Sequence, residues 1–173
     1  VNVEPVYQKS IKDLREIGEA DVIVGADGAN SLVRRTHEAA FGTTTKLLKN
    51  RFAWYGTRKR FAALSHTFVT TPYGTFNAHH HPHAKNMSTF VVEMDEATFE
   101  KNGFAELPQP EAQALCEKVF ARSLEGEPLI NNNSIWRRFP RIATQRWSVG
   151  NCVLLGDALH TAHFSIGSGT RLA

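Results

Sequence analysis

The pattern of hydrophobic and polar positions predicts strands near both ends of the chain and throughout its middle. Residues 1–7 alternate between apolar and polar side chains, and residues 22–24 form a short β-branched run of the kind buried in sheets. Residues 51–95 are rich in Thr, Phe, Tyr, Val and Trp, and two turn-like segments at 72–74 and 82–86 interrupt them. This middle pattern is typical of antiparallel strands joined by hairpins. Three further strands are expected at 135–139, 146–149 and 152–155.

Helices are predicted on both sides of this strand-rich segment. One is expected over 32–41, with Ser31 as its N-cap and Gly42 as its stop. A longer one within 108–126 begins near Pro110 and ends before Gly126. We expect its buried face to hold four apolar residues: Ala114, Leu115, Val119 and Phe120. Shorter elements are expected at 10–20, as a helix or a loop, and at 95–104, with Asp95 near the start.

Together these elements predict an α+β fold with a mixed, largely antiparallel sheet and flanking helices. Residues 1–45 and 146–173 are expected to form two pieces of one domain, and residues 46–145 the sheet and helix of another. The length of 173 residues allows a sizeable core, and 42% apolar and 21% charged residues are typical of a globular protein.

Charge and cysteine content narrow the classes of partner and compartment. The net charge of +3 permits an anionic ligand but does not predict nucleic-acid binding. Cys116 and Cys152 lie far apart and form no metal-type pair, so we expect buried thiols in a reducing, cytoplasmic environment. The apolar runs are strand-sized, far short of the roughly 20 residues of a membrane-spanning helix, so no membrane association is expected.

Two strands lead directly into turns that contain glycine and aspartate, GADG at 25–28 and GDALH at 156–160. A strand that enters such a turn and a helix start offers unpaired backbone N–H groups, which can bind phosphate. An aspartate at the end of the strand can accept hydrogen bonds from a ribose hydroxyl. For either turn alone, a plain tight loop is the favoured interpretation.

The two stretches together resemble the paired motifs of the flavin-dependent aromatic hydroxylases, the single-component FAD monooxygenases typified by para-hydroxybenzoate hydroxylase. In the later stretch Leu159 replaces the usual Ala and Phe164 replaces the usual Pro. The matching residues of the first stretch, DVIVGADGANSLVRR, are Asp21, Val24, Gly25, Ala26, Asp27, Gly28, Ser31, Val33 and Arg34. Those of the second stretch are Gly150, Val153, Leu155, Gly156, Asp157, Ala158, His160, Gly167 and Gly169.

This resemblance implies that FAD and NAD(P)H are the cofactors. By resemblance, Asp157 would bind ribityl or ribose hydroxyls, residues 25–34 would contact the pyrophosphate region, and residues 163–170 would lie along the isoalloxazine ring. The implied cofactor-binding residues are Gly25, Asp27, Gly28, Arg34, Gly156, Asp157, Ala158, Gly167, Ser168, Gly169 and Thr170. No metal site is expected among them, and we assign no catalytic side chain from the sequence.

Softer similarity, in FAWYGT, GTFNAHHHPH and STFVVEMDEATFE, points to the branch that hydroxylates aromatic acyl-CoA thioesters such as salicylyl-CoA and 2-aminobenzoyl-CoA. The implied partner is therefore a small aromatic substrate, with a CoA thioester as its candidate form and a homodimer as the candidate assembly. The alternatives are a hydroxylase of free aromatic acids, another FAD oxidoreductase of the same fold, or a non-catalytic binding fragment.

The G-x-G-x-x-G turn with which this family begins has no match in the chain. We therefore expect the sequence to enter the family pattern downstream of that turn. A fragment of this kind is expected to bind FAD weakly or not at all and to be inactive when isolated.

The sequence HHHPH at 79–83 supports two hypotheses. On a strand, His79, His81 and His83 would share one face and suggest zinc, but Pro82 disturbs the register and no Cys or carboxylate completes a usual ligand set. We favour a substrate-facing or solvated strand. The candidate substrate-contacting residues are His79, His81, His163 and Phe164. The cations in 46–51 and 137–146 suit either a solvated face or contacts to CoA phosphates.

Overall fold

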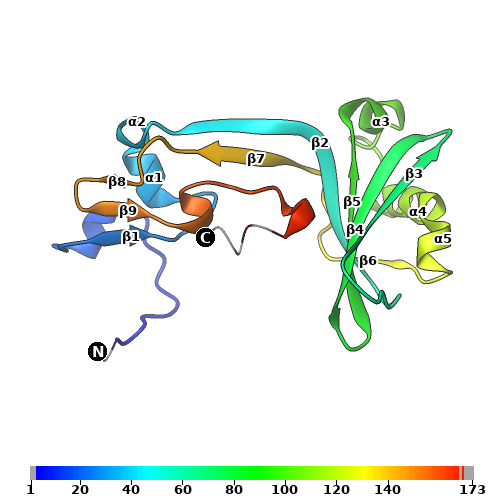
Figure 1. The fold of residues 1–173 in the computed structure, drawn as a ribbon, viewed down its shortest axis with the longest axis horizontal. Coiled ribbons are helices and arrows are strands. Elements are labelled where there is room, and N and C mark those ends of the chain that lie inside the picture. Colours follow the sequence, from blue (N-terminus) through cyan, green and yellow to red (C-terminus); the bar gives the residue numbers. More distant parts are fainter. Residues whose placement is uncertain (1–2, 168, 170–173) are drawn as a thin grey trace. The chain divides into compact units, whose positions relative to one another are not determined.

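The strand-rich middle segment contributes four strands to a six-stranded sheet. In the computed structural model, which describes residues 3–167 and residue 169, the strand order is β3-β4-β5-β2-β6, and β7 pairs with β2 (Figure 1). Strands β3, β4, β5 and β2 pair antiparallel, as expected from hairpin connections. The bounds are β2 Thr44–Thr57, β3 Ser65–Thr71, β4 Gly74–Ala84, β5 Met87–Met94, β6 Leu129–Asn131 and β7 Arg137–Ala143.

A second, three-stranded sheet joins segments from the two ends of the sequence. Its order is β1-β9-β8, with β1 parallel to β9 and β8 antiparallel to β9. The bounds are β1 Ile23–Gly25, β8 Ser148–Val149 and β9 Cys152–Leu154. The predicted α+β fold, with a mixed, largely antiparallel sheet and flanking helices, is confirmed.

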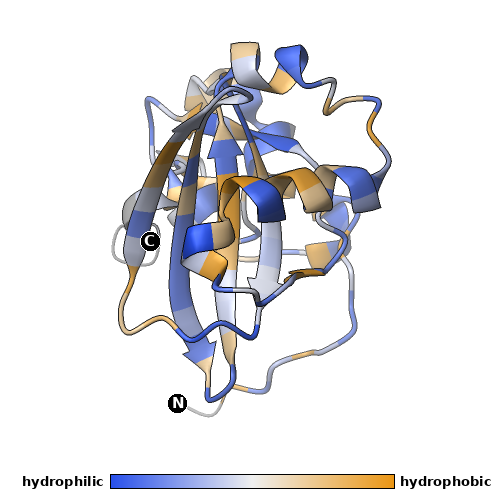
Figure 2. Ribbon diagram, turned by 90° about the vertical axis from the view of Figure 1, so that its right-hand side faces the viewer, coloured by the Kyte–Doolittle hydropathy of each residue, from blue (hydrophilic) through white to orange (hydrophobic). Residues whose placement is uncertain are grey.

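Three helices pack on one face of the larger sheet; in Figure 2 two of them lie in front of its strands and the first lies at their upper end. They are α3 Glu96–Lys101, α4 Gln109–Val119 and α5 Ala121–Leu124. The core between them and the sheet contains Tyr55, Phe76, Phe90, Phe120 and Leu124, none more than 2% exposed.

The buried face of α4 differs from the predicted one. Ala114 is exposed, whereas Ala112 and Cys116 are buried together with Val119 and Phe120. Positions 112, 116, 119 and 120 follow the spacing i, i+4, i+7 and i+8 of one helical stripe, and position 114 lies on the opposite side. The burial of the Cys116 and Cys152 thiols agrees with the sequence.

The smaller sheet packs against α1 Leu32–Thr36 and α2 Glu38–Phe41, with a core of Val33, Phe41, Cys152, Leu154, Ala158 and Leu159. The predicted helix over 32–41 therefore exists but is divided at His37. Gly42 ends it in the left-handed conformation, as the sequence predicts. Three short 3₁₀ elements complete this part: η1 Leu14–Ile17, η2 Gly156–Ala158 and η3 Phe164–Ile166.

The strand predicted at the start of the chain is wrong for the described residues 3–7, which form no strand. Val3, Val6 and Tyr7 are each more than 75% exposed. A strand requires a neighbour to receive its backbone hydrogen bonds, and none of the described strands pairs with this segment. Alternation alone could not reveal that a partner strand is missing.

The chain divides into two compact units, one made of Val1–Lys46 and Pro140–Ala173 and the other of Leu47–Phe139. Strands β2 and β7 each contribute residues to both units. The assignment of the outer segments to FAD and of the middle segment to the substrate stays a prediction. Among the described residues, no helix has the length and apolar character needed to cross a bilayer.

Candidate functional site

Parallel pairing of β1 and β9 brings the two glycine–aspartate turns to the same edge of the small sheet. Gly25 stands opposite Leu154, and the N–H of Leu155 donates to the carbonyl of Gly25 at 2.9 Å. Both strands end at this edge, so the turn at 26–28 and the turn η2 leave the sheet side by side. The carboxyl ends of neighbouring parallel strands are where α/β proteins bind nucleotides.

Arg34 ties these two turns together. Its side chain is 5% exposed, and Nη1 donates to the carbonyl of Ala158 at 2.7 Å and to that of Asp157 at 3.5 Å. Nη2 donates to the carbonyl of Ala29 in the first turn. Burial lowers the pKa of Arg34 from its ordinary value. The guanidinium therefore holds the two turns together, which makes Arg34 a positioning residue for the candidate site.

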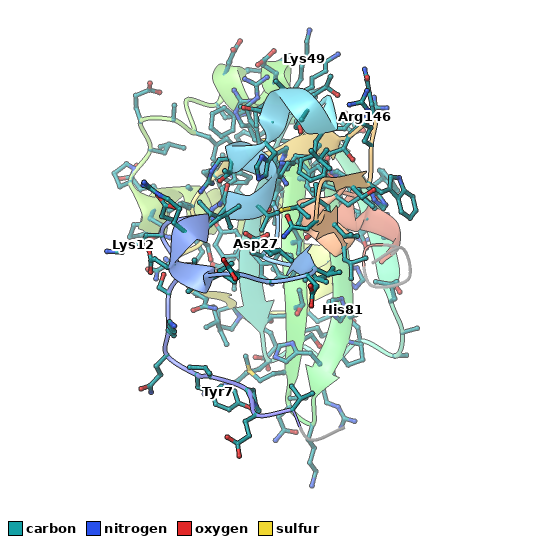
Figure 3. The ribbon with its side chains drawn as sticks, turned by 90° about the vertical axis from the view of Figure 1, so that its left-hand side faces the viewer. Tyr7, Lys12, Asp27, Lys49, His81 and Arg146 are labelled. Atoms are coloured by element: carbon teal, nitrogen blue, oxygen red, sulfur yellow. The ribbon has the colours of Figure 1, made fainter. Side chains whose placement is uncertain are left out.

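Asp27 caps helix α1, and its place in the turn between β1 and α1 is labelled in Figure 3. Its carboxylate accepts hydrogen bonds from the N–H groups of Leu32 at 2.6 Å and Val33 at 3.5 Å. Ser31 accepts from the N–H of Arg34 at 3.0 Å. Burial alone would raise the pKa of Asp27, but hydrogen bonds from Ser31 and Leu32 outweigh it, so this pKa lies below its ordinary value.

These caps correct one expectation about the first turn. The N–H groups of Leu32, Val33 and Arg34 already donate to side chains, so the start of α1 does not offer them to a phosphate. The physical reason is that GADGANS carries its own acceptors, Asp27 and Ser31, at the positions that cap a helix.

Gly25 serves close packing between α1 and the small sheet. A Cβ atom at this position would lie 2.8 Å from Cβ of Val33 and 2.9 Å from Cδ2 of Leu154. Only glycine leaves room for the helix to pack this closely on the strands. The structure thus gives Gly25 a role in placing the turn.

The residues best placed to contact a cofactor are those that are exposed or have open backbone, in contrast to the hydrogen-bonded and closely packed residues described above. The side chain of Asp157 is exposed, whereas the neighbouring Ala158 is fully buried. Gly28 and Gly167 adopt positive φ angles of 77° and 62°, and a Cβ at either would meet no atom within 4 Å. An exposed carboxylate suits the hydroxyl groups of FAD, and open glycine backbone permits close approach. The residues present therefore fit this cofactor.

The segment predicted to lie along the flavin is partly described. His163 Nδ1 accepts from the N–H of Ser165 at 3.4 Å at the start of η3, and the His163 and Phe164 rings stack with centroids 4.3 Å apart. Gly167 ends η3 in the left-handed conformation, and Gly169 follows it. The predicted contacts of Ser168 and Thr170 lie outside the described residues.

A second group of polar residues lies in the larger unit, on the sheet face opposite the helices. We call this the Glu93 face. Residues paired directly across antiparallel strands point to the same side, as do residues two apart on one strand. The register pairs Phe52 with Glu93, Trp54 with Val91, Asn77 with Glu93, His79 with Val91, His81 with Thr89, His66 with His79 and Phe68 with Asn77.

Glu93 anchors a connected set of hydrogen bonds on this face. Its carboxylate, 5% exposed, lies 2.9 Å from Nδ2 of Asn50, 3.3 Å from Nδ2 of Asn77 and 3.2 Å from Nε2 of His79. Nδ1 of His79 lies 2.9 Å from Nε2 of His66. His79 is buried, whereas His66 is exposed, so the network runs from the interior to the surface of the unit.

The remaining histidines of β4 differ in surroundings. His80 points to the opposite face, where its ring stacks on Phe61 and Phe90; burial lowers its pKa to about 4. His81 is half-buried on the Glu93 face and is labelled in Figure 3, and His83 is exposed. The register shift between Pro82 and Ala84 agrees with the predicted disturbance at Pro82. In the part of the chain that the structure describes, no group of three His, Cys, Asp or Glu side chains is arranged to hold a metal ion.

Sequence reasoning identified His79 but missed Glu93 and His66. A single acidic residue within the apolar run STFVVEM was the available signal, because a charge inside a buried strand needs partners. His66 could not be assigned without the register of β3 against β4.

The chain belongs to the FAD binding domain family, whose sequence pattern matches residues 2–173. It is 35% identical to salicyloyl-CoA 5-hydroxylase of a Streptomyces species, a match covering 99% of this chain and 35% of that protein. It is 44% identical to a 3-hydroxy-4-methyl-anthranilyl-[aryl-carrier protein] 5-monooxygenase of Streptosporangium sibiricum, over 91% of this chain and 41% of that protein.

Two solved structures share the fold. One is the tetrameric form of 2-methyl-3-hydroxypyridine-5-carboxylic acid oxygenase, with a TM-score of 0.63, 18% identity, and coverage of 87% of this chain and 41% of that one. The other is PqsL of Pseudomonas aeruginosa in complex with 2-aminobenzoylacetate, with a TM-score of 0.60, 19% identity, and coverage of 88% and 42%. The chain thus spans about two fifths of the length of the proteins it matches.

Proposed function

We propose that this chain is part of an FAD-dependent monooxygenase that hydroxylates an aromatic ring, with NAD(P)H as the electron donor and O2 as the oxygen source. The observation that carries the proposal is the arrangement of the two glycine–aspartate turns, which Arg34 holds together where β1 and β9 end. Membership of the FAD binding domain family over residues 2–173 supports it.

Each part of the candidate cofactor site has a separate task in this proposal. Asp157 would accept hydrogen bonds from hydroxyl groups of FAD, and the open backbone at Gly28 and Gly167 would allow close approach. Asp27 and Arg34 would keep the turns in place. FAD, when bound, supplies the transfer of electrons from NAD(P)H to oxygen, and the protein binds, orients and excludes water.

For the substrate, we propose an aromatic ring that carries a hydroxyl group and is held as a thioester. The names of the two similar proteins, which act on a salicyloyl-CoA and on a carrier-linked hydroxyanthranilyl group, support this class. Trp54 and Phe68, 47% and 69% exposed, give the Glu93 face flat apolar surface for a ring. The exposed cations Lys49 and Arg137, on β2 and β7, suit the phosphates of a CoA or pantetheine arm. A reducing cytoplasmic setting suits the two free, buried thiols.

The test is NAD(P)H consumption by the full-length, FAD-loaded protein with salicyloyl-CoA, benzoyl-CoA and free salicylate. The proposal predicts that salicyloyl-CoA stimulates consumption and yields a hydroxylated thioester detected by mass spectrometry. Stimulation by free salicylate but not by the thioester would contradict the thioester assignment. Failure of the full-length protein to bind FAD, together with absence of any stimulation, would contradict the enzyme class.

A further inference from the structure

We infer that the side-chain oxygen Oδ1 of Asn77 accepts a hydrogen bond from a hydroxyl or amino group of the substrate ring, and that it thereby selects rings that carry such a donor. This inference rests on the proposed function, because it names the ring substituent that the Glu93 face recognises. In it, Asn77 contacts the substrate, and Glu93 is a positioning residue that orients the Asn77 amide.

Glu93 fixes the orientation of this amide. Its carboxylate has three nitrogen atoms within 3.3 Å, Nδ2 of Asn50, Nδ2 of Asn77 and Nε2 of His79, and these stabilise the charged form. A charged carboxylate only accepts hydrogen bonds, whereas an amide donates from its NH2 end and accepts at its oxygen. Turning the Asn77 amide over would set two acceptors against each other. The NH2 end of Asn77 therefore faces Glu93, and Oδ1 is left for another partner.

Oδ1 of Asn77 lacks a donor in the part of the chain that the structure describes. The atom is buried, and no described residue donates a hydrogen bond to it. Leaving a buried acceptor unpaired is unfavourable, and the large majority of buried polar atoms in proteins have a partner. The other amide that bonds Glu93 belongs to Asn50, which is exposed to water. Of these two amides, that of Asn77 is the one whose oxygen a donor on a ligand would satisfy.

Asn77 lies beside the apolar surface proposed for the ring. It stands in one row across the sheet, with Glu93 of β5 opposite it on one side and Phe68 of β3 on the other. Residues paired directly across antiparallel strands point to the same side of the sheet, with Cβ atoms about 4.5–5.5 Å apart. Phe68 is 69% exposed, so a ring can pack on it. The edge of that ring then lies within reach of the Asn77 amide.

An amide oxygen distinguishes ring substituents by their chemistry. It accepts a hydrogen bond from a hydroxyl or an amino group, whereas a ring hydrogen or a methoxy group offers it no donor. A site built to hydrogen-bond one group of a substrate rejects the analogue that lacks this group, because the polar atom of the site is then left unpaired. The substrate class that follows is a hydroxyaryl or aminoaryl thioester.

The test measures Kd by titration calorimetry for four thioesters bound to the full-length, FAD-loaded protein without NAD(P)H. Salicyloyl-CoA and 2-aminobenzoyl-CoA carry a ring donor, whereas benzoyl-CoA carries no substituent and 2-methoxybenzoyl-CoA carries an oxygen without its hydrogen. The unaltered protein should bind the first two at least about tenfold more tightly than the last two. In N77L, whose leucine has a similar size but no acceptor, the four Kd values should agree within about threefold.

Two further variants separate recognition from a structural role. N50L removes the other amide that bonds Glu93 but keeps Asn77, so it should retain the preference for ring donors. E93Q introduces a side chain that can donate as well as accept, so the Asn77 amide can turn over and the preference should fall toward that of N77L.

The outcomes distinguish this inference from the proposed function. An equal loss of affinity for all four thioesters in N77L, or a preference that N77L retains, would overturn the role of Asn77 alone. The unaltered protein tests the inference even where a variant fails to fold, because equal Kd values for the four thioesters would also overturn it. If no thioester binds and none stimulates NAD(P)H consumption, the inference and the proposed function fail together.

Discussion

Nη1 of Arg34 and the carbonyl oxygen of Ala158 form a 2.7 Å hydrogen bond across 124 positions of the sequence. The same guanidinium also binds the carbonyl of Ala29 in the turn after β1. Because backbone carbonyls accept these bonds, the contact fixes the path of the chain in both turns. The arginine of the first motif thus orients the second motif, and with it the exposed Asp157.

Replacing Arg34 by methionine should lower the free energy of unfolding by about 3 kcal/mol. The change retains much of the side-chain volume but leaves the carbonyls of Ala29 and Ala158 without their charged donor in a buried place. Urea denaturation measures the effect. R35M is the matched control, since Arg35 is exposed and bonds one carbonyl, that of Asn30. It should change stability by less than about 1 kcal/mol. Equal effects of the two substitutions would contradict the role given to Arg34.

Gly25→Ala should destabilise the protein by about 1–3 kcal/mol, the usual cost of overpacking a core. Its new methyl group would lie 2.8 Å from Cβ of Val33, which neither the helix nor the strand can avoid by moving a side chain alone. The matched control is Gly56→Ala, whose new Cβ would stand 3.4 Å from its nearest neighbour, Cε of Met87. Thermal unfolding should show a lower Tm for the first variant and little change for the second. A Tm that is unchanged in G25A would mean that the close packing is not required.

The pH dependence of the free energy of unfolding should include a contribution from His80. Its pKa is lowered from 6.5 to about 4, mainly by burial and then by the neighbouring His66, His79 and His81. Below pH 6.5 the unfolded chain takes up a proton at His80, whereas the folded chain takes up this proton only below about pH 4. The free energy of unfolding therefore falls as the pH drops through this window.

Urea denaturation at several pH values tests this expectation with His80→Gln. Glutamine does not titrate but can still bond to the hydroxyl of Thr67, which lies 2.8 Å from Nε2 of His80. The variant should lose less stability than the unaltered protein between pH 6.5 and 4. Parallel curves for the two proteins would show that His80 titrates normally in the folded state.

How far the sequence could predict this structure depends on the range of the interactions involved. The Ser31 cap, the Gly42 stop and the hairpin at 72–74 follow from local chemistry, and the structure contains all three. The missing strand at 3–7 could not be foreseen, because strand formation depends on a partner elsewhere in the chain. The turn after β1 was only partly predictable. Its motif was recognised from the sequence, but the capping of α1 by Asp27 was not.

Predicting the Glu93 face from the sequence would have required the pairing register of three strands at once. His66, His79 and Glu93 come from β3, β4 and β5, and a shift of one residue in either pairing would turn a member of the network to the opposite face. The sequence shows three histidines in a row at 79–81, yet their environments differ completely. His79 bonds a carboxylate, His80 packs against the rings of Phe61 and Phe90, and His81 is half-buried.

The central claim is that the turns after β1 and β9 form the FAD site, with Asp157 as the residue that contacts the cofactor. The most direct measurement is the Kd for FAD of full-length protein carrying Asp157→Ala, determined by flavin fluorescence after removal of bound cofactor. Glu19→Ala, which removes an exposed carboxylate from the same unit, is the control. We predict that Asp157→Ala weakens FAD binding at least about tenfold, the loss expected for a charged hydrogen-bond acceptor, with unfolding unchanged. An unaltered Kd in that variant would contradict the account.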